Sequence, residues 1–244
     1  MQPDEARARI AALGFSDADT ETLFRHYDDA ERRGKRGHGY SRIAWLETLP
    51  DLDPTAAPGR EQVTDCYELW EGRGALGYLT LNAIVESQLA APPEHARVVA
   101  ASNCFPTGML GHYVRRLADG GLVALLTATS PPRLAHPDGG EPLVGTNPLA
   151  IGVPSSDGKP IVVDVSPAKA TWGEVLAGLA PADDVVPFGG EQAHKAFALA
   201  LGLQLVIDSL VEGYGAVLVV ALPSADPVPA LRAAAAGVRL PGDR

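Results

Sequence analysis

The sequence has little of several features that mark particular classes of protein. Only two cysteines, Cys66 and Cys104, occur in 244 residues, and they form neither a CxxC pair nor a disulfide framework. Reduced thiols are therefore expected, and a structural zinc site is not. Basic residues are outnumbered, 20 against 30 acidic ones. Because they do not gather into a long tract that could neutralise a phosphate backbone, nucleic acid is not an expected partner.

Long apolar runs and the common nucleotide-binding motifs are also missing. No segment approaches the roughly 18 apolar residues of a membrane span, and the start, MQPDEARARI, lacks the apolar stretch of a signal peptide. We therefore expect a cytoplasmic protein that does not bind membranes. No G-x-G-x-x-G opens a helix after a strand, and no G-x-x-x-x-G-K-[ST] occurs. Neither a Rossmann fold nor a P-loop is indicated.

The sequence does contain an alternation of helical and strand-like segments. Apolar residues at helical spacing, with Ser16 and Asp17 placed to cap a helix, predict a helical segment over residues 1–50. After a Pro- and Ala-rich linker, an α/β domain is expected over 60–244. Its predicted strands are 63–70, 97–101, 122–127, 149–153, 161–165 and 216–222, and its predicted helices include 77–89, 193–210 and 229–237.

Residues 37–42, Gly-His-Gly-Tyr-Ser-Arg, hold the first candidates for catalysis. Flanking glycines leave His38 with little side-chain cover, which suits a proton donor that must approach a substrate, and an ordinary histidine pKa of about 6.5 suits neutral pH. Arg42 follows on the same short segment, and a guanidinium presents paired donors that match a carboxylate. A solvated loop histidine after a basic helix end is the alternative interpretation of His38.

Two further candidates lie near the predicted strands. Gly145-Thr146-Asn147 stands between a Pro- and Gly-rich loop that begins at Ser130 and a strand. Backbone amides in such turns bind anions, although an ordinary Asn-Pro turn explains the same residues. Asp164 ends an apolar run. A carboxylate there is costly unless it is paired, so it either caps residues 166–169 or orients a cationic or histidine partner.

A last candidate precedes the long apolar helix. Gly189 and Gly190 are followed by His194 and Lys195, and a glycine pair before a helix N-terminus with a lysine in its first turn suits a phosphate. A loop followed by a solvated lysine is the alternative.

Read in order, the motifs resemble the signatures of one family. HGYSR, GALG, SNCF, TSPP, GGEPLVGTNPLAIGVP, VVDVSPAKATWG, PFGG, HK and RLPGDR are similar to successive motifs of the malate/L-lactate dehydrogenase-like oxidoreductases. The resemblance implies a non-Rossmann α/β fold, a mixed sheet with helices packed on it. It also implies a homodimer that binds NADH or NADPH near the subunit interface and transfers a hydride to C2 of a small 2-oxo acid or cyclic imino acid.

The resemblance assigns roles to individual residues. It makes His38 the catalytic histidine, Arg42 the receiver of the substrate carboxylate, and Asp164 the partner of the histidine in proton delivery. The residues that it implies for cofactor binding are Ser130, Gly145, Thr146, Asn147, Gly189, Gly190, His194 and Lys195.

Departures from the family pattern leave a second hypothesis open. Gly37 stands where the family has a serine, and Cys104 stands where it has a histidine near the nicotinamide. Cys104 and the nearby His112 therefore complete the expected cofactor set. The chain is also shortened over 173–187 and 222–238, where the family encloses the cofactor. The alternative is a divergent member without nicotinamide binding, either a non-redox enzyme that uses His38 and Cys104 on a small carboxylate or a binding protein.

Overall fold

The computed structural model describes residues 1–243, with a helical start followed by alternating helices and strands. The α-helices are α1 (Pro3–Ala12), α2 (Asp17–Arg32), α3 (Ser41–Leu46), α4 (Gly77–Ala90), α5 (Leu110–Asp119), α6 (Trp172–Leu176), α7 (Ala193–Asp208) and α8 (Val228–Ala234). Short 3-10 turns are η1 (Arg36–His38), η2 (Ala182–Asp184) and η3 (Gly190–Gln192). The strands are β1 (Gly59–Val63), β2 (Tyr67–Glu71), β3 (Ala96–Ser102), β4 (Val123–Ala128), β5 (Leu149–Val153), β6 (Ile161–Val165) and β7 (Ala216–Ala221).

The strands form one mixed sheet in the order β1-β2-β3-β7-β4-β5-β6. Strands β2 and β3 are parallel, and the other neighbouring pairs are antiparallel. As a result β2, β3, β4 and β6 run in the same direction. Their carboxyl ends meet the starts of β5 and β7 at one end of the sheet, and the loops there lie close together. The mixed sheet expected from the sequence is confirmed.

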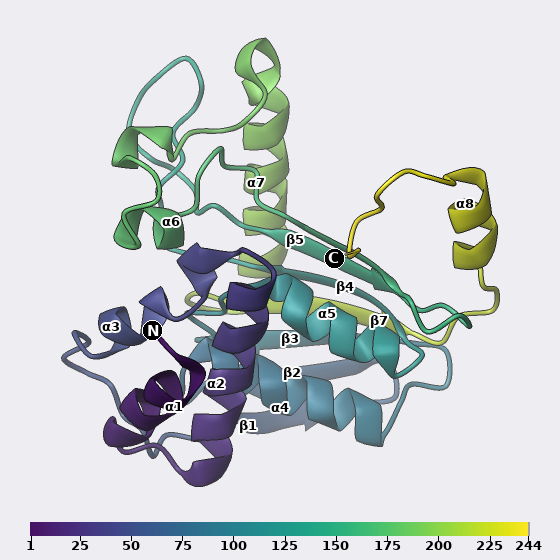
Figure 1. Ribbon diagram of the computed structural model, residues 1–244, viewed down its shortest axis with the longest axis horizontal. Coiled ribbons are helices and arrows are strands. Elements are labelled where there is room, and N and C mark those ends of the chain that lie inside the picture. Colours follow the sequence, from purple (N-terminus) through teal and green to yellow (C-terminus); the bar gives the residue numbers. More distant parts are fainter. Residues whose placement is uncertain (244) are drawn as a thin grey trace.

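Helices α4 and α5 cover one face of the sheet, and the N-terminal helices pack beside them (Figure 1). Apolar residues of α4 and α5 form the main core with those of β3, β4 and β7. A second core joins α1, α2 and α3 to the start of α4, with Ile10, Leu23 and Ile43 fully buried. Ser16 caps α2 as expected, because its hydroxyl accepts a hydrogen bond from the amide of Asp19.

The predicted strand 63–70 is confirmed only from Tyr67 onward, because the chain turns at residues 64–66 and forms a hairpin. Strand β1 ends at Val63 and β2 begins at Tyr67. Thr64 closes the turn: its amide donates to the Tyr67 carbonyl at 2.8 Å, and its side-chain oxygen accepts from the Tyr67 amide at 3.0 Å. The charged Gly59–Val63 segment carries little apolar pattern, because it is an exposed edge strand, and that is why the sequence did not indicate a strand there.

The opposite face of the sheet is apolar but only partly covered. Strand register places one side chain from each of six strands in a single row across it: Tyr67, Val98, Val219, Leu125, Ile151 and Val163. Helix α7 and the turn after it cover only one part of this face, where Ile207 and Val211 pack on β3 and β7. Val219 and Leu125 each remain 37% exposed. We call this row the open sheet face.

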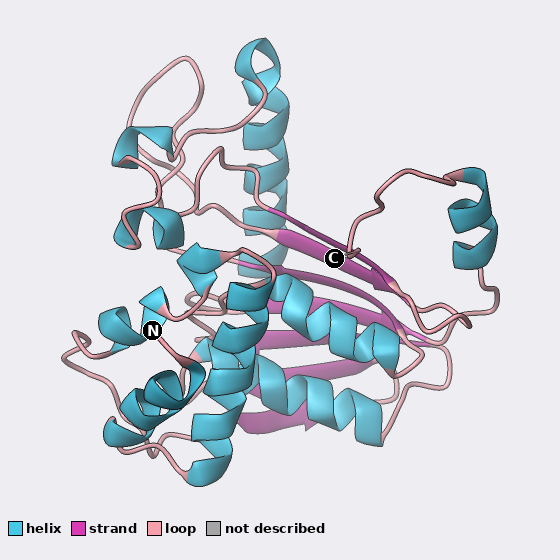
Figure 2. Cartoon of the chain, viewed as in Figure 1, coloured by secondary structure: helices cyan, strands magenta, loops and turns pink. Residues whose placement is uncertain are grey.

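Beside the sheet, the segment between β6 and α7 forms a lobe that is mostly loop (Figure 2). Its small core joins Phe197 and Ala200 of α7 to Leu134, Val144 and Val185, with Trp172 packed against it. Strand β6 is the last strand of the sheet, and on its free side the Val162 amide donates to the Pro241 carbonyl at 3.2 Å. Within residues 1–243, no helix is both long and apolar enough to cross a membrane.

Candidate active site

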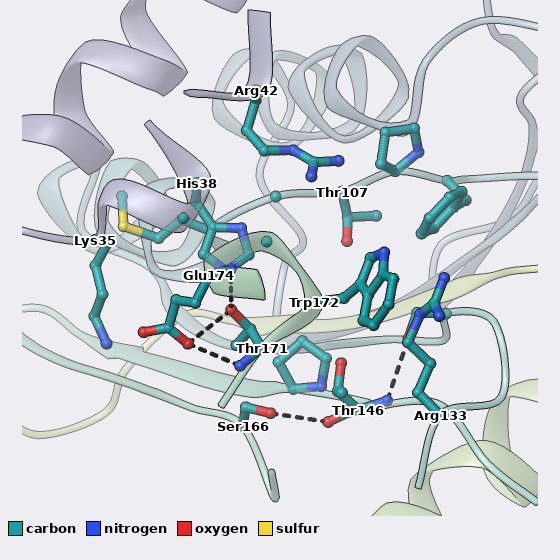
Figure 3. Close-up of a pocket in the computed structure, with 18 of the residues that line it drawn as sticks. Lys35, His38, Arg42, Thr107, Arg133, Thr146, Ser166, Thr171, Trp172 and Glu174 are labelled. Atoms are coloured by element: carbon teal, nitrogen blue, oxygen red, sulfur yellow. Dashed lines mark hydrogen bonds between the residues drawn. The ribbon is translucent and has the colours of Figure 1, made fainter. Parts of the chain in front are cut away.

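A cavity lies where the N-terminal helices meet the carboxyl ends of the parallel strands (Figure 3). It holds about 1090 Å³ of empty space, part of it open to solvent. Segments far apart in the sequence line it: η1 and α3, the loops after β3 and β4, the residues just before β5, the end of β6, and α6. Five of the residues expected at the site meet here, namely His38, Arg42, Ser130, Thr146 and Asp164.

His38 enters the cavity because η1 packs tightly against α6. A Cβ atom on Gly37 would lie only 2.6 Å from the amide nitrogen of Glu174, so glycine is required at this contact. A Cβ on Gly173 would in turn clash with the Gly37 carbonyl. This close approach gives a physical reason why glycine, and not serine, precedes the histidine in this chain.

The surroundings of His38 disfavour its charged form. Burial, followed by the positive charge of Arg42, lowers the pKa of His38 to about 4, and Glu174 opposes this only in part. The imidazole is therefore neutral at pH 7 while the cavity holds no anion. An anion that neutralises Arg42 would raise the His38 pKa again.

Arg42 is a buried cation without an acidic partner. Its side chain is on α3, the residue is only 7% exposed, and its guanidinium carbon lies 4.0 Å from the centre of the Trp45 ring. Within the described chain no carboxylate forms an ion pair with it, and its Nε lacks a hydrogen-bond partner. An unpaired buried charge is costly. The arrangement therefore favours a ligand that brings a carboxylate.

Asp164 faces the cavity from the end of β6. Its Oδ2 accepts a hydrogen bond from the amide of Gly111 at 2.9 Å, at the start of α5, and burial raises its pKa. The interpretation in which Asp164 caps residues 166–169 is wrong, because the Ser166 hydroxyl accepts from the Ala168 amide there. Lys35 is the nearby cation that opposes the pKa rise. Asp164 and His38 line the same cavity without a direct hydrogen bond among the described residues.

The lining side chains that sequence reasoning missed include Lys35, Arg133 and Trp172. The guanidinium carbon of Arg133 lies 3.7 Å from the centre of the Trp172 ring. The two residues are far apart in the sequence, and only the fold brings the loop after β4 onto α6. No local motif signals such a pair.

Comparison with known proteins identifies the family. The chain matches the family model described as malate/L-lactate dehydrogenase over residues 4–189. It belongs to the malate/L-lactate dehydrogenase family. Over 174 residues it is 31% identical to a (2R)-3-sulfolactate dehydrogenase (NADP(+)) from Chromohalobacter salexigens, an alignment that covers 70% of this chain and 52% of that protein. It is 28% identical over 230 residues to a Delta(1)-pyrroline-2-carboxylate/Delta(1)-piperideine-2-carboxylate reductase from Pseudomonas putida, covering 82% of this chain and 67% of that one.

A solved structure confirms the fold expected from the motifs. Malate dehydrogenase from Entamoeba histolytica superposes with a TM-score of 0.83 at 17% identity, over 99% of this chain and 85% of that one. At that identity the likeness concerns the fold alone. The chain spans about half the length of the sulfolactate dehydrogenase, 52%.

Several residues that resemble malate/L-lactate dehydrogenase motifs lie outside the cavity lining. Asn147 is fully buried, and its Nδ2 donates to the Ala200 carbonyl and to Gln204 Oε1, both at 2.9 Å. The Gly145 amide donates to the same Gln204 oxygen at 3.5 Å. These two residues of the motif tie the loop to α7, and only Thr146 between them lines the cavity. The Thr146 amide donates to the Ser130 hydroxyl at 3.2 Å.

The glycine pair and the His-Lys pair also lie away from the cavity. Gly190 begins the 3-10 turn η3, so α7 starts at Ala193. His194 and Lys195 are exposed in its first turn, and none of these four motif residues lines the cavity. Glu191 and Gln192 of this turn separate the glycine pair from α7.

Neither Cys104 nor His112 replaces the missing family histidine in the cavity. Cys104 is fully buried, its Sγ lies 3.8 Å from the Gly77 carbonyl oxygen, and burial raises the pKa of its thiol to about 12. His112 points from α5 toward α2, where its Nδ1 lies 3.1 Å from Asp29 Oδ2. A protonated, buried thiol is a poor nucleophile, so the structure does not favour the non-redox chemistry that would use Cys104.

Proposed function

We propose that this protein is an NAD(P)H-dependent reductase that converts a small 2-oxo acid or cyclic imino acid to the 2-hydroxy or 2-amino acid. One observation carries the proposal: in a member of this family, a buried and unpaired Arg42 stands beside His38 in one cavity. The printed names of the relatives support it, because they are an NADP(+)-dependent sulfolactate dehydrogenase and a pyrroline- and piperideine-carboxylate reductase.

The side chains of the cavity fit a nicotinamide dinucleotide. Thr107, Ser130 and Thr146 present hydroxyl groups, prolines add apolar wall, and Lys35 is an exposed cation at the same cavity. These hydroxyls would hold the cofactor through hydrogen bonds, and Lys35 would face its phosphates. When bound, the cofactor supplies the hydride that reduces C2 of the substrate.

The protein's own residues then orient the substrate and move the proton. Arg42 binds the substrate carboxylate through two parallel hydrogen bonds, which fixes the position of C2. The same carboxylate offsets the charge of Arg42, which after burial is the second cause of the lowered His38 pKa, so substrate binding favours the protonated form of His38. His38 delivers that proton to the carbonyl oxygen or imine nitrogen as C2 is reduced. Asp164, whose pKa burial raises, is a second titrating group in the same cavity.

Binding of the cofactor tests this proposal directly. Titration of the protein with NADH and with NADPH, followed by nicotinamide fluorescence, is expected to show a saturable complex with at least one of them. Oxidation of the bound cofactor is then followed with pyruvate and with Δ1-piperideine-2-carboxylate. Absence of a complex with either nucleotide would favour the alternative, a family member that binds a small carboxylate without redox chemistry. The same titration compares the affinities for NADH and NADPH.

We also propose that the protein is a homodimer. The open sheet face supports this, because its row of apolar side chains, five aliphatic and one tyrosine, crosses six strands and α7 covers only one part of it. Contiguous apolar surface of this kind is characteristic of protein interfaces.

A further inference from the structure

Side chains from two other elements fix the start of α5. The first amides of an α-helix have no partners within the helix, and the N-cap residue Met109 supplies no side-chain cap. Instead the Met109 amide donates to His26 Nε2 on α2 at 3.0 Å, and the Gly111 amide donates to Asp164 Oδ2 at 2.9 Å. His26 and Asp164 together therefore take the place of an N-cap. Figure 1 shows α2 beside the start of α5.

The His26 ring is enclosed by aromatic rings and by the loop that it bonds. The residue is only 2% exposed, and its ring centre lies 4.9 Å from those of Tyr78 on α4 and His112 on α5. The loop before α5 packs directly on the ring. Gly108 has a φ of +70° there, and a Cβ on it would lie 2.4 Å from His26 Nε2. The loop and the ring therefore cannot move independently of each other.

His26 accepts this hydrogen bond only while Nε2 carries no proton. Burial, followed by the charges of His112 and His38, lowers the pKa of His26. The ring is therefore neutral at pH 7, with its proton on Nδ1. Among residues 1–243 Nδ1 has no hydrogen-bond partner. A buried polar ring with one unpaired nitrogen is costly, and an apolar side chain would fill the same space without that cost. The acceptor at Nε2 is what the histidine adds.

The segment that His26 holds belongs to the cavity. Thr107, Gly108 and Met109 all line it. Two residues further on, α5 meets Asp164 so closely that a Cβ on Gly111 would lie 2.9 Å from Asp164 Oδ2. A displacement of the first turn of α5 would change this wall of the cavity. It would also change the hydrogen bond that the Asp164 carboxylate accepts.

We propose that His26 is a positioning residue of the active site: it sets the first turn of α5 through the Met109 amide, and this turn orients the Asp164 carboxylate through Gly111. His26 does not itself line the cavity, so it acts on the site only through α5. The inference rests on the proposed function, because that function gives the cavity its chemistry, and it adds a residue that no motif of the sequence indicates.

The first experiment measures the ionisation of Asp164 and needs neither cofactor nor turnover. Burial raises the Asp164 pKa, and the hydrogen bond from Gly111 opposes that rise, so loss of this bond is expected to raise the pKa further. On α5 itself, His112 is turned toward Asp29. The titratable groups that share the cavity with Asp164, all on other segments than α5, are Lys35, His38, Arg42, Tyr78, Arg133 and Glu174.

Two variants of His26 separate the acceptor from the ring. In His26→Gln the side-chain oxygen reaches the position of Nε2 and accepts from the Met109 amide, whereas the shorter side chain in His26→Asn does not reach it. Carbon-13 NMR of the Asp164 carboxyl group, identified by its loss in Asp164→Asn, follows the titration. We expect His26→Asn to raise the Asp164 pKa by at least about 0.5, and His26→Gln to leave it near the wild-type value.

Leu23→Ala is the control for a general loss of stability. Leu23 is a fully buried residue of the second core on the same helix α2, so this variant is less stable but keeps the acceptor and should keep the Asp164 pKa. Equal Asp164 pKa values in His26→Asn and His26→Gln overturn the inference, and so does an equal rise in Leu23→Ala. If His26→Asn does not fold, His26→Leu, which also lacks an acceptor, takes its place. If neither folds, the bond serves folding and not positioning, and the inference is overturned.

The second experiment connects this geometry to turnover. The family motif makes Asp164 the partner of His38 in proton delivery, and Arg42 still binds the substrate carboxylate in the variants. We therefore expect His26→Asn to lower kcat at least about tenfold with less than about a threefold change in KM, and His26→Gln to recover most of kcat. The substrate is whichever of pyruvate and Δ1-piperideine-2-carboxylate the wild type reduces. A change in KM larger than that in kcat overturns the inference. Failure of the proposed function looks different: the wild type binds neither nucleotide, and the Asp164 pKa values alone then decide.

Discussion

At the scale of single residues, the environment of Arg42 says most about the chemistry of the ligand. Replacement by lysine keeps the charge but loses the planar pair of donors. We expect Arg42→Lys to raise the KM for an accepted 2-oxo or imino acid at least about tenfold, which corresponds to about 1.4 kcal/mol of lost binding, and Arg42→Ala to raise it further. Steady-state kinetics measure this. Unchanged kinetics in both variants, with cofactor binding intact, would show that the carboxylate binds elsewhere.

His38 leads to a prediction about pH. Its pKa is about 4 in the free protein because of burial and the charge of Arg42, and an anion on Arg42 raises that pKa. The anion therefore binds the protein with protonated His38 more tightly than the protein with neutral His38. As pH rises from the His38 pKa of the free protein, about 4, to the higher His38 pKa of the complex, the affinity for the anion falls. We expect the affinity for oxamate to fall between pH 5 and pH 8, with proton uptake in calorimetry. In His38→Asn the proton uptake should fall, with Asp164, whose pKa burial raises, left as the other titrating group of the cavity. A flat profile in the wild type contradicts the coupling.

The sequence located some residues of the site correctly and could not locate others. His38, Arg42 and Thr146 were found because each type of residue stands in a short motif whose chemistry is plain. Asn147 lies in such a motif too, but its side chain turns toward α7 and forms hydrogen bonds there. Motif letters do not encode the direction of a side chain. The contact of Arg133 with Trp172 depends on tertiary structure alone.

At the scale of elements, the contact between η1 and α6 fixes the position of His38. A Cβ on Gly173 would meet the Gly37 carbonyl, so the two backbones would have to separate. We expect Gly173→Ala to lower the free energy of unfolding by about 1–3 kcal/mol and to reduce turnover, because η1 carries the histidine. Urea denaturation gives the first quantity and initial rates the second.

Gly202→Ala is the control for this prediction. It makes the same chemical change in α7, where a Cβ would meet nothing within 4 Å, so it should leave activity intact and stabilise the helix by up to about 1 kcal/mol. Equal stability of Gly173→Ala and the wild type would mean that the contact between η1 and α6 relaxes without cost.

Apolar periodicity predicted most elements of the fold but missed strand β1. Helix α4 and strands β5 and β6 begin and end close to the predicted bounds because their apolar faces are buried. Strand β1 was missed because an exposed edge strand needs no apolar alternation. The order of the strands could not be obtained from the sequence, because pairing between distant segments leaves no local pattern.

At the scale of the whole molecule, the open sheet face predicts the assembly. Static light scattering at micromolar concentration should give the mass of a dimer. A charged side chain in the middle of the open sheet face should disrupt the dimer. We therefore expect Val219→Asp to give a monomer that keeps its secondary structure. Val63→Asp is the control, since Val63 is an exposed strand valine that pairs with Glu68 on the other side of the sheet. A monomeric wild type would remove the dimer from the proposal.

The position of β6 at the edge of the sheet has a kinetic consequence for the site. This strand carries Asp164 but pairs only with β5, apart from the contact of Val162 with Pro241. Edge strands open by local unfolding more readily than central strands such as β7, which has neighbours on both sides. Asp164 therefore lies on a strand whose backbone amides are less protected from hydrogen exchange than those of the central strands. Because a ligand that contacts Asp164 binds only the closed form, its binding should slow amide hydrogen exchange in β6 more than in β7.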